Sequence, residues 1–231
     1  MSNHNNTILL NIPVYCGIFL ANLLGCQLVK TSYLIKSYES CENLNFWLFL
    51  CIFNNCNFWM IYALSIKDIY ILSSCYISWL GSLLVIIKLL IYQYQLLPLN
   101  PLLIKFQIVT LLYILLCASF ETIILNINKY LLYGITCNIY QLLYYSSPLI
   151  NLCKIIKTKN ISSLYLPMMV LGTANTCCWV SYALINKDIF QIIPNIFALG
   201  FLTLQWIIYY IFNFSQLNKS ITNAPEDVIH Y

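Results

Sequence analysis

The sequence predicts an all-α integral membrane protein in which seven transmembrane helices form two parallel three-helix bundles joined by a linker helix (3+1+3). The composition, a series of long apolar runs and an internal repeat all point to this fold class. Of the 231 residues, 61% are hydrophobic and only 8% are charged, whereas a soluble domain is roughly 25% charged. A soluble core that buried so much apolar surface would lack the polar surface to cover it. The composition therefore excludes a soluble enzyme and a nucleic-acid-binding chain.

Seven apolar runs are long enough to cross a bilayer, since a helix needs about 20 residues to span the ~30 Å hydrocarbon core. They cover residues 12–30, 44–65, 70–92, 101–125, 130–153, 164–185 and 190–213. The charged pairs Lys67-Asp68 and Lys187-Asp188, and the prolines at 98 and 101, mark helix ends between them. We therefore predict an outer segment 1–11, a first bundle 12–92, a linker helix with its loops 93–129, a second bundle 130–213 and a cytosolic tail 214–231.

The positions of the lysines predict the orientation in the membrane. With the N-terminus outside and the C-terminus in the cytosol, eight lysines lie on the inner side and three on the outer side. Such an excess of inner cations is the positive-inside bias. The outer three are Lys67, Lys129 and Lys187. For this multi-pass chain we expect the plasma membrane, with an internal membrane as the alternative.

Histidine and cysteine usage argues against metal, cofactor and enzyme chemistry. The only histidines, His4 and His230, lie in the polar end segments, so the membrane core has no histidine ligand or proton relay. The eleven cysteines lie mostly inside apolar runs and form no CxxC pair, which favours small hydrophobic side chains over a metal or disulfide framework. We expect no metal site, no cofactor and no catalytic residues.

An internal repeat at an offset of 120 residues is the most informative pattern. Residues 55–69 read NCNFWMIYALSIKDI and residues 175–189 read NTCCWVSYALINKDI, with eight of fifteen positions identical. These segments belong to the second and sixth predicted spans, so both copies cross the membrane in the same sense. A parallel repeat of this kind is a transporter architecture, whose binding site lies at the repeat interface near the bilayer midplane.

Uncharged polar and aromatic residues are the candidates for a binding site. Trp179 offers an indole face for the C–H face of a sugar ring, and Asn195 offers amide donors and an acceptor for hydroxyl groups. Asn175 lies one turn from Trp179 on the same helix face. The alternative is that the tryptophan packs the bundle and the asparagines hydrogen-bond between helices. The residues alone favour neither interpretation.

The few acids and prolines have two interpretations each. Asp68 and Asp188 are either solvated partners of the adjacent lysines or parts of an outer gate with Tyr62 and Tyr182. Glu121 either extends to the membrane surface or couples protons. The proline at 148 either acts as a hinge or only kinks its helix.

Taken together, these residues resemble the SWEET family of sugar transporters. The matching block runs from Tyr145 to Tyr210 and contains YSSPL, KIIKTKNIS, NTCCWVSYAL and KDIFQIIPN, whereas the first half matches clearly only at 55–69. The resemblance places Trp179 and Asn195 in the sugar pocket, with Trp59 at the equivalent first-repeat position. Asn175 and its repeat equivalent Asn55 are further candidate binding residues. It makes Tyr62, Asp68, Tyr182 and Asp188 outer-gate residues, and Pro148 an inner hinge.

The first repeat departs from the family pattern. Cys75 stands where the family has its second pocket asparagine, and Gln27-Leu28 stands where the family has a serine-proline pair. Of the four hinge prolines, only Pro148 is in register.

The resemblance implies facilitative transport, or uniport, of a small sugar by alternating access. It also implies that copies of the chain associate as a homo-oligomer within the lipid bilayer. Two alternatives remain: a PQ-loop-like carrier of an amino acid or other small metabolite, and a non-transporting seven-span receptor or scaffold.

Overall fold

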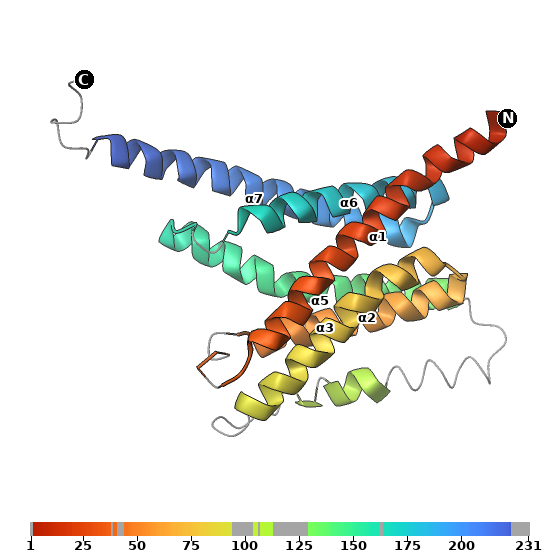
Figure 1. The fold of residues 1–231 in the computed structure, drawn as a ribbon, viewed down its shortest axis with the longest axis horizontal. Coiled ribbons are helices and arrows are strands. Elements are labelled where there is room, and N and C mark those ends of the chain that lie inside the picture. The colour runs from red at the N-terminus through yellow and green to blue at the C-terminus, as the bar shows by residue number, and fades with distance from the viewer. Residues whose placement is uncertain are drawn as a thin grey trace.

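The computed structural model describes residues 2–37, 39–40, 44–93, 104–105, 107–112, 129–161 and 164–222. Within these residues the chain forms long helices and no strands (Figure 1). The helices are α1 (Ser2–Leu34), α2 (Phe46–Ile66), α3 (Ile69–Gln93), α5 (Lys129–Thr158), α6 (Leu166–Asn186) and α7 (Ile189–Thr222). Residues 104–105 and 107–112 are a helical piece of the predicted linker. The rest of that linker span, with Glu121, lies outside the described residues.

Five of these helices contain apolar stretches long enough to cross a membrane. The stretches are Ile12–Leu34, Phe46–Ile66, Ile69–Tyr92, Leu166–Asn186 and Ile189–Phe214. Two helices extend beyond their predicted spans: α1 already begins at Ser2, within the predicted segment 1–11, and α7 continues to Thr222, into the predicted tail. No glycine or proline interrupts residues 2–12 or 201–222, so the helical hydrogen bonding continues past the apolar run.

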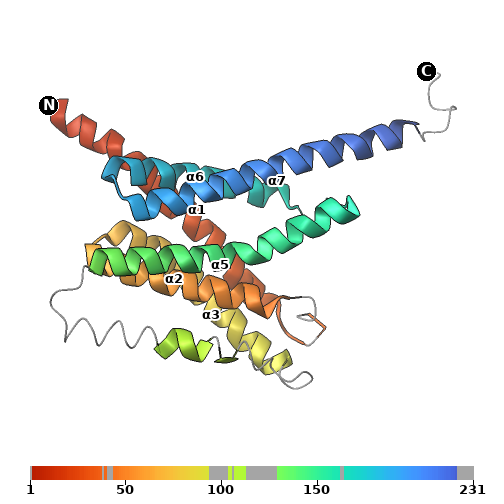
Figure 2. The ribbon, with the colours of Figure 1, turned by 180° about the vertical axis from the view of Figure 1, so that it is seen from behind.

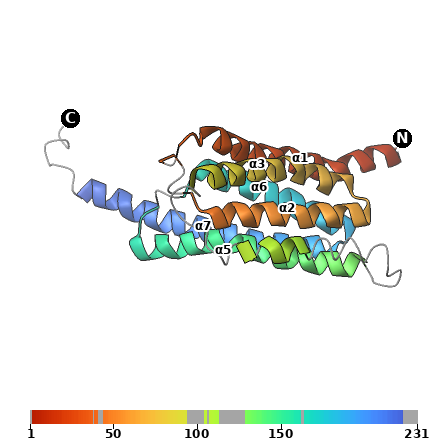
Figure 3. The same ribbon diagram turned by 90° about the horizontal axis from the view of Figure 1, so that it is seen from below.

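The helices pack as two related bundles. In the first bundle α3 contacts both α1 and α2, and in the second α7 contacts both α5 and α6. Between the bundles, α1 contacts α6 and α2 contacts α5. The repeat relates α1, α2 and α3 to α5, α6 and α7. The contacts of α3 therefore correspond to those of α7, and the α1–α6 contact corresponds to the α2–α5 contact. Seen from below, in Figure 3, the helices run roughly along one direction, and in Figure 1 α1 crosses α6 and α7. The structure therefore has the parallel repeat that the sequence predicts.

The α2–α3 and α6–α7 turns have the same backbone geometry. Lys67 and Lys187 end their helices in the left-handed conformation, with φ of 59° and 53°. In the next position, the Asp68 N–H donates to Ala63 O at 2.8 Å, and the Asp188 N–H donates to the equivalent carbonyl oxygen in α6 at 3.0 Å. These hydrogen bonds satisfy carbonyls at the helix end. Each turn thereby places an aspartate at the start of α3 or α7.

Among the described residues, the hydrophobic core joins the two bundles at one end only. We call this the Tyr–Asp end, after Tyr62, Asp68, Tyr182 and Asp188. One cluster there combines residues of both bundles, including Phe58, Tyr62, Tyr133 and Tyr182. Toward the opposite end, separate clusters occupy each bundle, one around Val85 and Leu89 and the other around Leu152 and Phe201. The ribbons of the two bundles diverge toward that end (Figure 2).

The described piece of the linker lies against the α2–α5 seam. The Asn54 side-chain amide donates to Gln107 Oε1 at 2.9 Å, and the hydroxyls of Thr110 and Tyr140 are hydrogen-bonded at 2.9 Å. The Tyr140 ring also stacks on Phe58, with centroids 4.1 Å apart. The linker is therefore bonded to one helix of each bundle.

Candidate functional site

Two reciprocal tyrosine–aspartate hydrogen bonds connect the bundles at the Tyr–Asp end. The Tyr62 hydroxyl, on α2, donates to both carboxylate oxygens of Asp188, at 2.8 Å and 2.7 Å. The Tyr182 hydroxyl, on α6, donates to Asp68 Oδ2 at 2.6 Å. Each repeat thus supplies one donor and one acceptor, and the offset of 120 residues relates the two pairs. These bonds connect the two bundles at the Tyr–Asp end.

Both aspartates also cap the helix that they begin. Asp68 Oδ1 accepts the backbone N–H groups of Tyr70 and Ile71, at 2.9 Å and 3.1 Å. Asp188 Oδ1 accepts the N–H of Phe190 at 3.0 Å. Such N-cap bonds satisfy donors that the first helical turn leaves unpaired. Each carboxylate is therefore held by the first turn of its own helix as well as by the tyrosine of the other bundle.

The two carboxylates differ in burial and in further partners. Asp188 is 6% exposed and also accepts hydrogen bonds from the Tyr130 hydroxyl, at 3.0 Å, and from the Gln191 amide. Asp68 is half-buried. A carboxylate with so little exposure requires hydrogen-bond donors from the protein. Asp188 is thus not a solvated partner of its neighbouring lysine, and both aspartates have the pairing with Tyr62 and Tyr182 that the alternative interpretation proposes.

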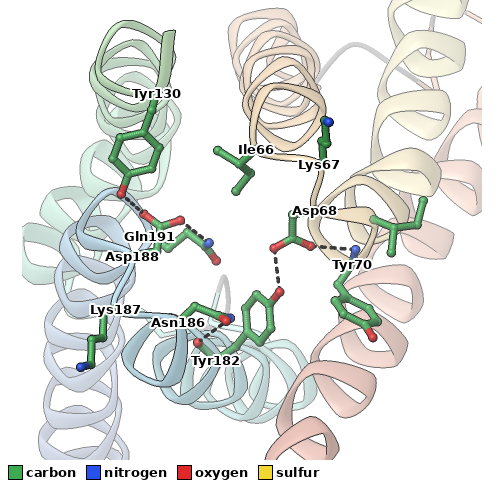
Figure 4. Close-up of a pocket in the computed structure, with 11 residues that line it drawn as sticks. Ile66, Lys67, Asp68, Tyr70, Tyr130, Tyr182, Asn186, Lys187, Asp188 and Gln191 are labelled. Atoms are coloured by element: carbon green, nitrogen blue, oxygen red, sulfur yellow. Dashed lines mark hydrogen bonds between the residues drawn. The ribbon is translucent and has the colours of Figure 1, made fainter. Parts of the chain in front are cut away.

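A cavity of about 380 Å³ lies at this end, between the two helix turns (Figure 4). In the close-up, Asp68 and Tyr182 point toward each other, while the Lys187 side chain points away from the centre. The volume of the cavity is in the range typical of small-molecule sites. Its lining comprises Ile66, Lys67, Asp68, Ile69, Tyr70, Tyr130, Tyr182, Asn186, Lys187, Asp188 and Gln191.

The predicted binding tryptophans lie next to Tyr62 and Tyr182 in the shared cluster. Trp59 meets Tyr62 edge-on with ring centroids 5.7 Å apart, and Trp179 meets Tyr182 in the same way at 5.7 Å. Trp59, Trp179 and Cys75 all belong to the cluster that joins the bundles. The structure therefore brings these three predicted site residues together at the repeat interface. The tryptophans lie about one helical turn from the paired tyrosines, and Cys75 lies about two turns from Asp68.

The indole N–H groups break the repeat symmetry. Trp179 Nε1 donates to Asn175 Oδ1 at 3.2 Å, which agrees with the predicted shared helix face. Trp59 Nε1 instead donates to Gln141 Oε1 on α5 at 3.0 Å, across the bundle interface. The repeat equivalent of Gln141 is Ala21, which has no side-chain acceptor, so the second-repeat tryptophan bonds within its own helix.

The predicted asparagines have unused hydrogen-bonding capacity. Asn195 Nδ2 donates to the Gln191 carbonyl oxygen at 2.8 Å, one turn earlier on α7. Asn55 Oδ1 is buried and has no hydrogen-bond partner among the described residues. An unsatisfied buried acceptor is a place where a ligand hydroxyl can donate. Neither asparagine lines the cavity at the Tyr–Asp end.

Pro148 lies far from the tyrosines and aspartates. It is inside α5, 18 residues after Tyr130, which corresponds to ~27 Å along a helix. The structure therefore does not bring this proline together with the other predicted gate residues, and its role as a hinge stays a prediction.

Sequence analysis missed Gln191, Tyr130 and Gln141. Gln191 follows Asp188 by three residues, which is the spacing of a helix capping box, so the sequence did contain a signal for its contact with the aspartate. For Tyr130 and Gln141 no such local signal exists, because their partners come from helices far away in the sequence.

A 3+1+3 arrangement of membrane-spanning helices with a parallel repeat is an architecture found among membrane transporters, and here two Tyr–Asp pairs join the bundles at one end. Residues 131–217 match the family described as sugar efflux transporters for intercellular exchange. Over 98 residues the chain is 38% identical to the putative bidirectional sugar transporter SWEET7d of Oryza sativa subsp. japonica, covering 42% of this chain and 36% of that protein. It is 40% identical over 85 residues to SWEET7b of Oryza sativa subsp. indica, covering 37% and 32%.

The fold also matches a solved structure. A eukaryotic SWEET transporter superposes with a TM-score of 0.73 at 16% identity, over 89% of this chain and 99% of that one. The fold class and the resemblance to the SWEET family are thereby confirmed: the second half carries the family's sequence, and the chain has the family's fold. The matched segments span about a third of the length of the curated relatives.

Proposed function

We propose that this chain is a facilitative transporter of a small sugar, working by alternating access between its two bundles. The observation that carries the proposal is the reciprocal pairing of Tyr62 with Asp188 and of Tyr182 with Asp68. These bonds cross from bundle to bundle at one end, while the hydrophobic clusters of the opposite end stay within single bundles. A closed gate at one end and separated bundles at the other are the features of one state of an alternating-access cycle.

In this proposal the Tyr–Asp end faces outward, with the N-terminus outside, the C-terminus in the cytosol and the plasma membrane as the location. The excess of lysines on the opposite side supports this orientation. Association into a homo-oligomer is supported only by the family resemblance.

The sugar would bind at the bundle interface, stacked on Trp179 and hydrogen-bonded by Asn195. The edge-on packing of Trp179 against Tyr182 supports this position, because it places the binding ring directly beside a gate residue. Asn55, Asn175, Trp59 and Cys75 would complete the site from both repeats. A carrier of this kind moves its solute downhill, with no cofactor and no covalent step.

The test is uptake and efflux of labelled glucose in a host that lacks hexose transporters. We expect wild-type flux to persist when the proton gradient is dissipated. We expect Trp179→Ala and Asn195→Ala each to lower flux by about tenfold or more, corresponding to about 1.4 kcal/mol of lost binding in the transport cycle. Matched controls are Trp206→Ala, whose indole donates to Thr173 instead, and Asn151→Ala, which is an exposed position.

Each other outcome points to a different function. If wild-type protein at the cell surface moves no mono- or disaccharide, the sugar assignment fails. Flux that amino acids inhibit and sugars do not would indicate the PQ-loop-like carrier. The absence of flux of any solute, with intact folding, would indicate the receptor or scaffold.

A further inference from the structure

Gln191 makes the two halves of the gate unequal. The residue that corresponds to it in the first repeat is Ile71, which is 3% exposed and offers no side-chain donor. Gln191 itself is 2% exposed, and its amide donates to Asp188. We propose that Gln191 is a positioning residue that keeps the Asp188 carboxylate hydrogen-bonded while the Tyr–Asp end is open. This inference rests on the alternating-access function proposed above.

The two carboxylate oxygens of Asp188 have different sets of donors. Asp188 Oδ1 accepts from the Tyr62 hydroxyl, from the Tyr130 hydroxyl and from the Phe190 N–H, at 2.8 Å, 3.0 Å and 3.0 Å. Asp188 Oδ2 has two donors among the described residues: the Tyr62 hydroxyl at 2.7 Å and the Gln191 amide. Without Gln191, therefore, Oδ2 would depend on Tyr62 alone.

The two donors of Oδ2 belong to different bundles. Tyr62 is on α2, in the first bundle, whereas Gln191 is on α7, in the same bundle as Asp188. When the bundles separate at this end, Tyr62 leaves and Gln191 stays. A buried carboxylate oxygen that loses its last donor is costly. Gln191 removes most of that cost, because it retains one hydrogen bond to Oδ2 throughout the cycle.

The first-repeat carboxylate does not need such a residue. Both aspartates line the cavity, but Asp68 is half-buried, so water can replace the Tyr182 hydroxyl when that bond breaks. Asp188 is only 6% exposed and relies more on side chains of its own bundle. The difference in burial therefore explains why an amide is useful at position 191 and an isoleucine suffices at position 71.

If the proposal is right, removing the Gln191 amide shifts the equilibrium of the Tyr–Asp end toward the closed state. Gln191→Ile, which copies the first repeat, removes one donor from the closed and the open state alike. The loss matters more in the open state, where Oδ2 then has no donor. We expect the ratio of open to closed Tyr–Asp ends to fall by about five-fold, or about 1 kcal/mol. Gln191→Met, which keeps the side-chain length but lacks the N–H groups, should give the same shift.

The ratio of open to closed Tyr–Asp ends can be measured from the distance between two spin labels. The labels are attached to non-natural amino acids with a ketone side chain, placed at positions 64 and 184. Leu64 and Leu184 are exposed, are related by the repeat and lie on different bundles. The experiment uses the full chain in lipid vesicles without sugar. It therefore tests Gln191 even if the wild-type protein carries no sugar, and a failed sugar assay alone leaves this result interpretable.

A double-mutant cycle separates the proposed role from a merely structural one. In a Tyr62→Phe background, Oδ2 lacks the tyrosine donor in both states, so Gln191→Ile should change the ratio by less than about two-fold. In a Tyr182→Phe background the full shift should persist. The proposal is overturned if Gln191→Ile shifts the ratio toward the open state or leaves it unchanged. It is equally overturned if the shift persists undiminished without the Tyr62 hydroxyl.

Discussion

Removal of the Tyr62 hydroxyl should open the Tyr–Asp end. Tyr62→Phe deletes the donor that reaches both oxygens of Asp188, from a side chain that is 0% exposed. The bond exists only when this end is closed, so its loss destabilises the closed state alone. Hydrogen bonds to charged groups contribute about 1.5–3 kcal/mol. Because Tyr130 and Gln191 keep Asp188 partly satisfied, we expect the lower limit, a shift of about tenfold toward the open state.

Tyr182→Phe is the matched variant in the other repeat. It removes one bond, to Asp68 Oδ2 at 2.6 Å, from a carboxylate that is half-buried and can be hydrated. Because water can replace the lost donor, we expect the low end of the net contribution of a hydrogen bond, about 0.5 kcal/mol, which is a shift of only about two- to threefold. The two variants change the same chemical group at positions related by the repeat, and only the environment of the acceptor differs.

Spin-label distances between positions 64 and 184 measure both shifts, and initial rates of sugar efflux from vesicles provide an independent check. Burial of the acceptor carboxylate does not set the size of the shift if Tyr182→Phe shifts the equilibrium as much as Tyr62→Phe does. The Tyr62 bond does not stabilise the closed state if Tyr62→Phe leaves the distance distribution unchanged while the protein remains folded.

Two further substitutions test the binding site and the packing. Cys75→Asn should lower the KM for sugar several-fold at unchanged abundance, because it adds an amide at the repeat equivalent of Asn195; an unchanged KM would remove Cys75 from the proposed site. Gly134→Ala should lower the thermal stability of the purified protein by about 1–3 kcal/mol, since a Cβ there would lie 2.3–2.6 Å from ring atoms of Phe190. Gly200→Ala is the control, with nothing within 4 Å of the new Cβ, and equal melting temperatures for the two variants would contradict the packing argument.

Local patterns were sufficient to predict much of the gate. The identical YAL and KDI segments of the two repeats predicted that Tyr62, Asp68, Tyr182 and Asp188 occupy equivalent positions, and the structure pairs them. What the sequence could not decide was whether the aspartates face water or the opposite bundle. That depends on how the two bundles pack against each other, which no local pattern encodes.

The contacts between the bundles could not be predicted from the sequence either. The bond from Trp59 to Gln141 joins residues 82 positions apart on α2 and α5, and repeat symmetry alone would have assigned Trp59 to Asn55 by analogy with Trp179. The ends of α1 and α7 were missed for a different reason. Hydropathy locates where a helix leaves the apolar layer, whereas the backbone hydrogen bonds continue for as long as no residue interrupts them.

The linker contacts have a consequence for the direction in which the molecule opens. Because Gln107 is bonded to α2 and Thr110 to α5, a large separation of those two helices would break at least one of these bonds. The described residues show no comparable connection across the α1–α6 seam, where Gly17 simply packs against Trp179. We therefore expect the bundles to rotate about an axis near α2 and α5. A solute would then enter and leave along the α1–α6 side, and bulky residues facing that side would limit the size of the sugar that can pass.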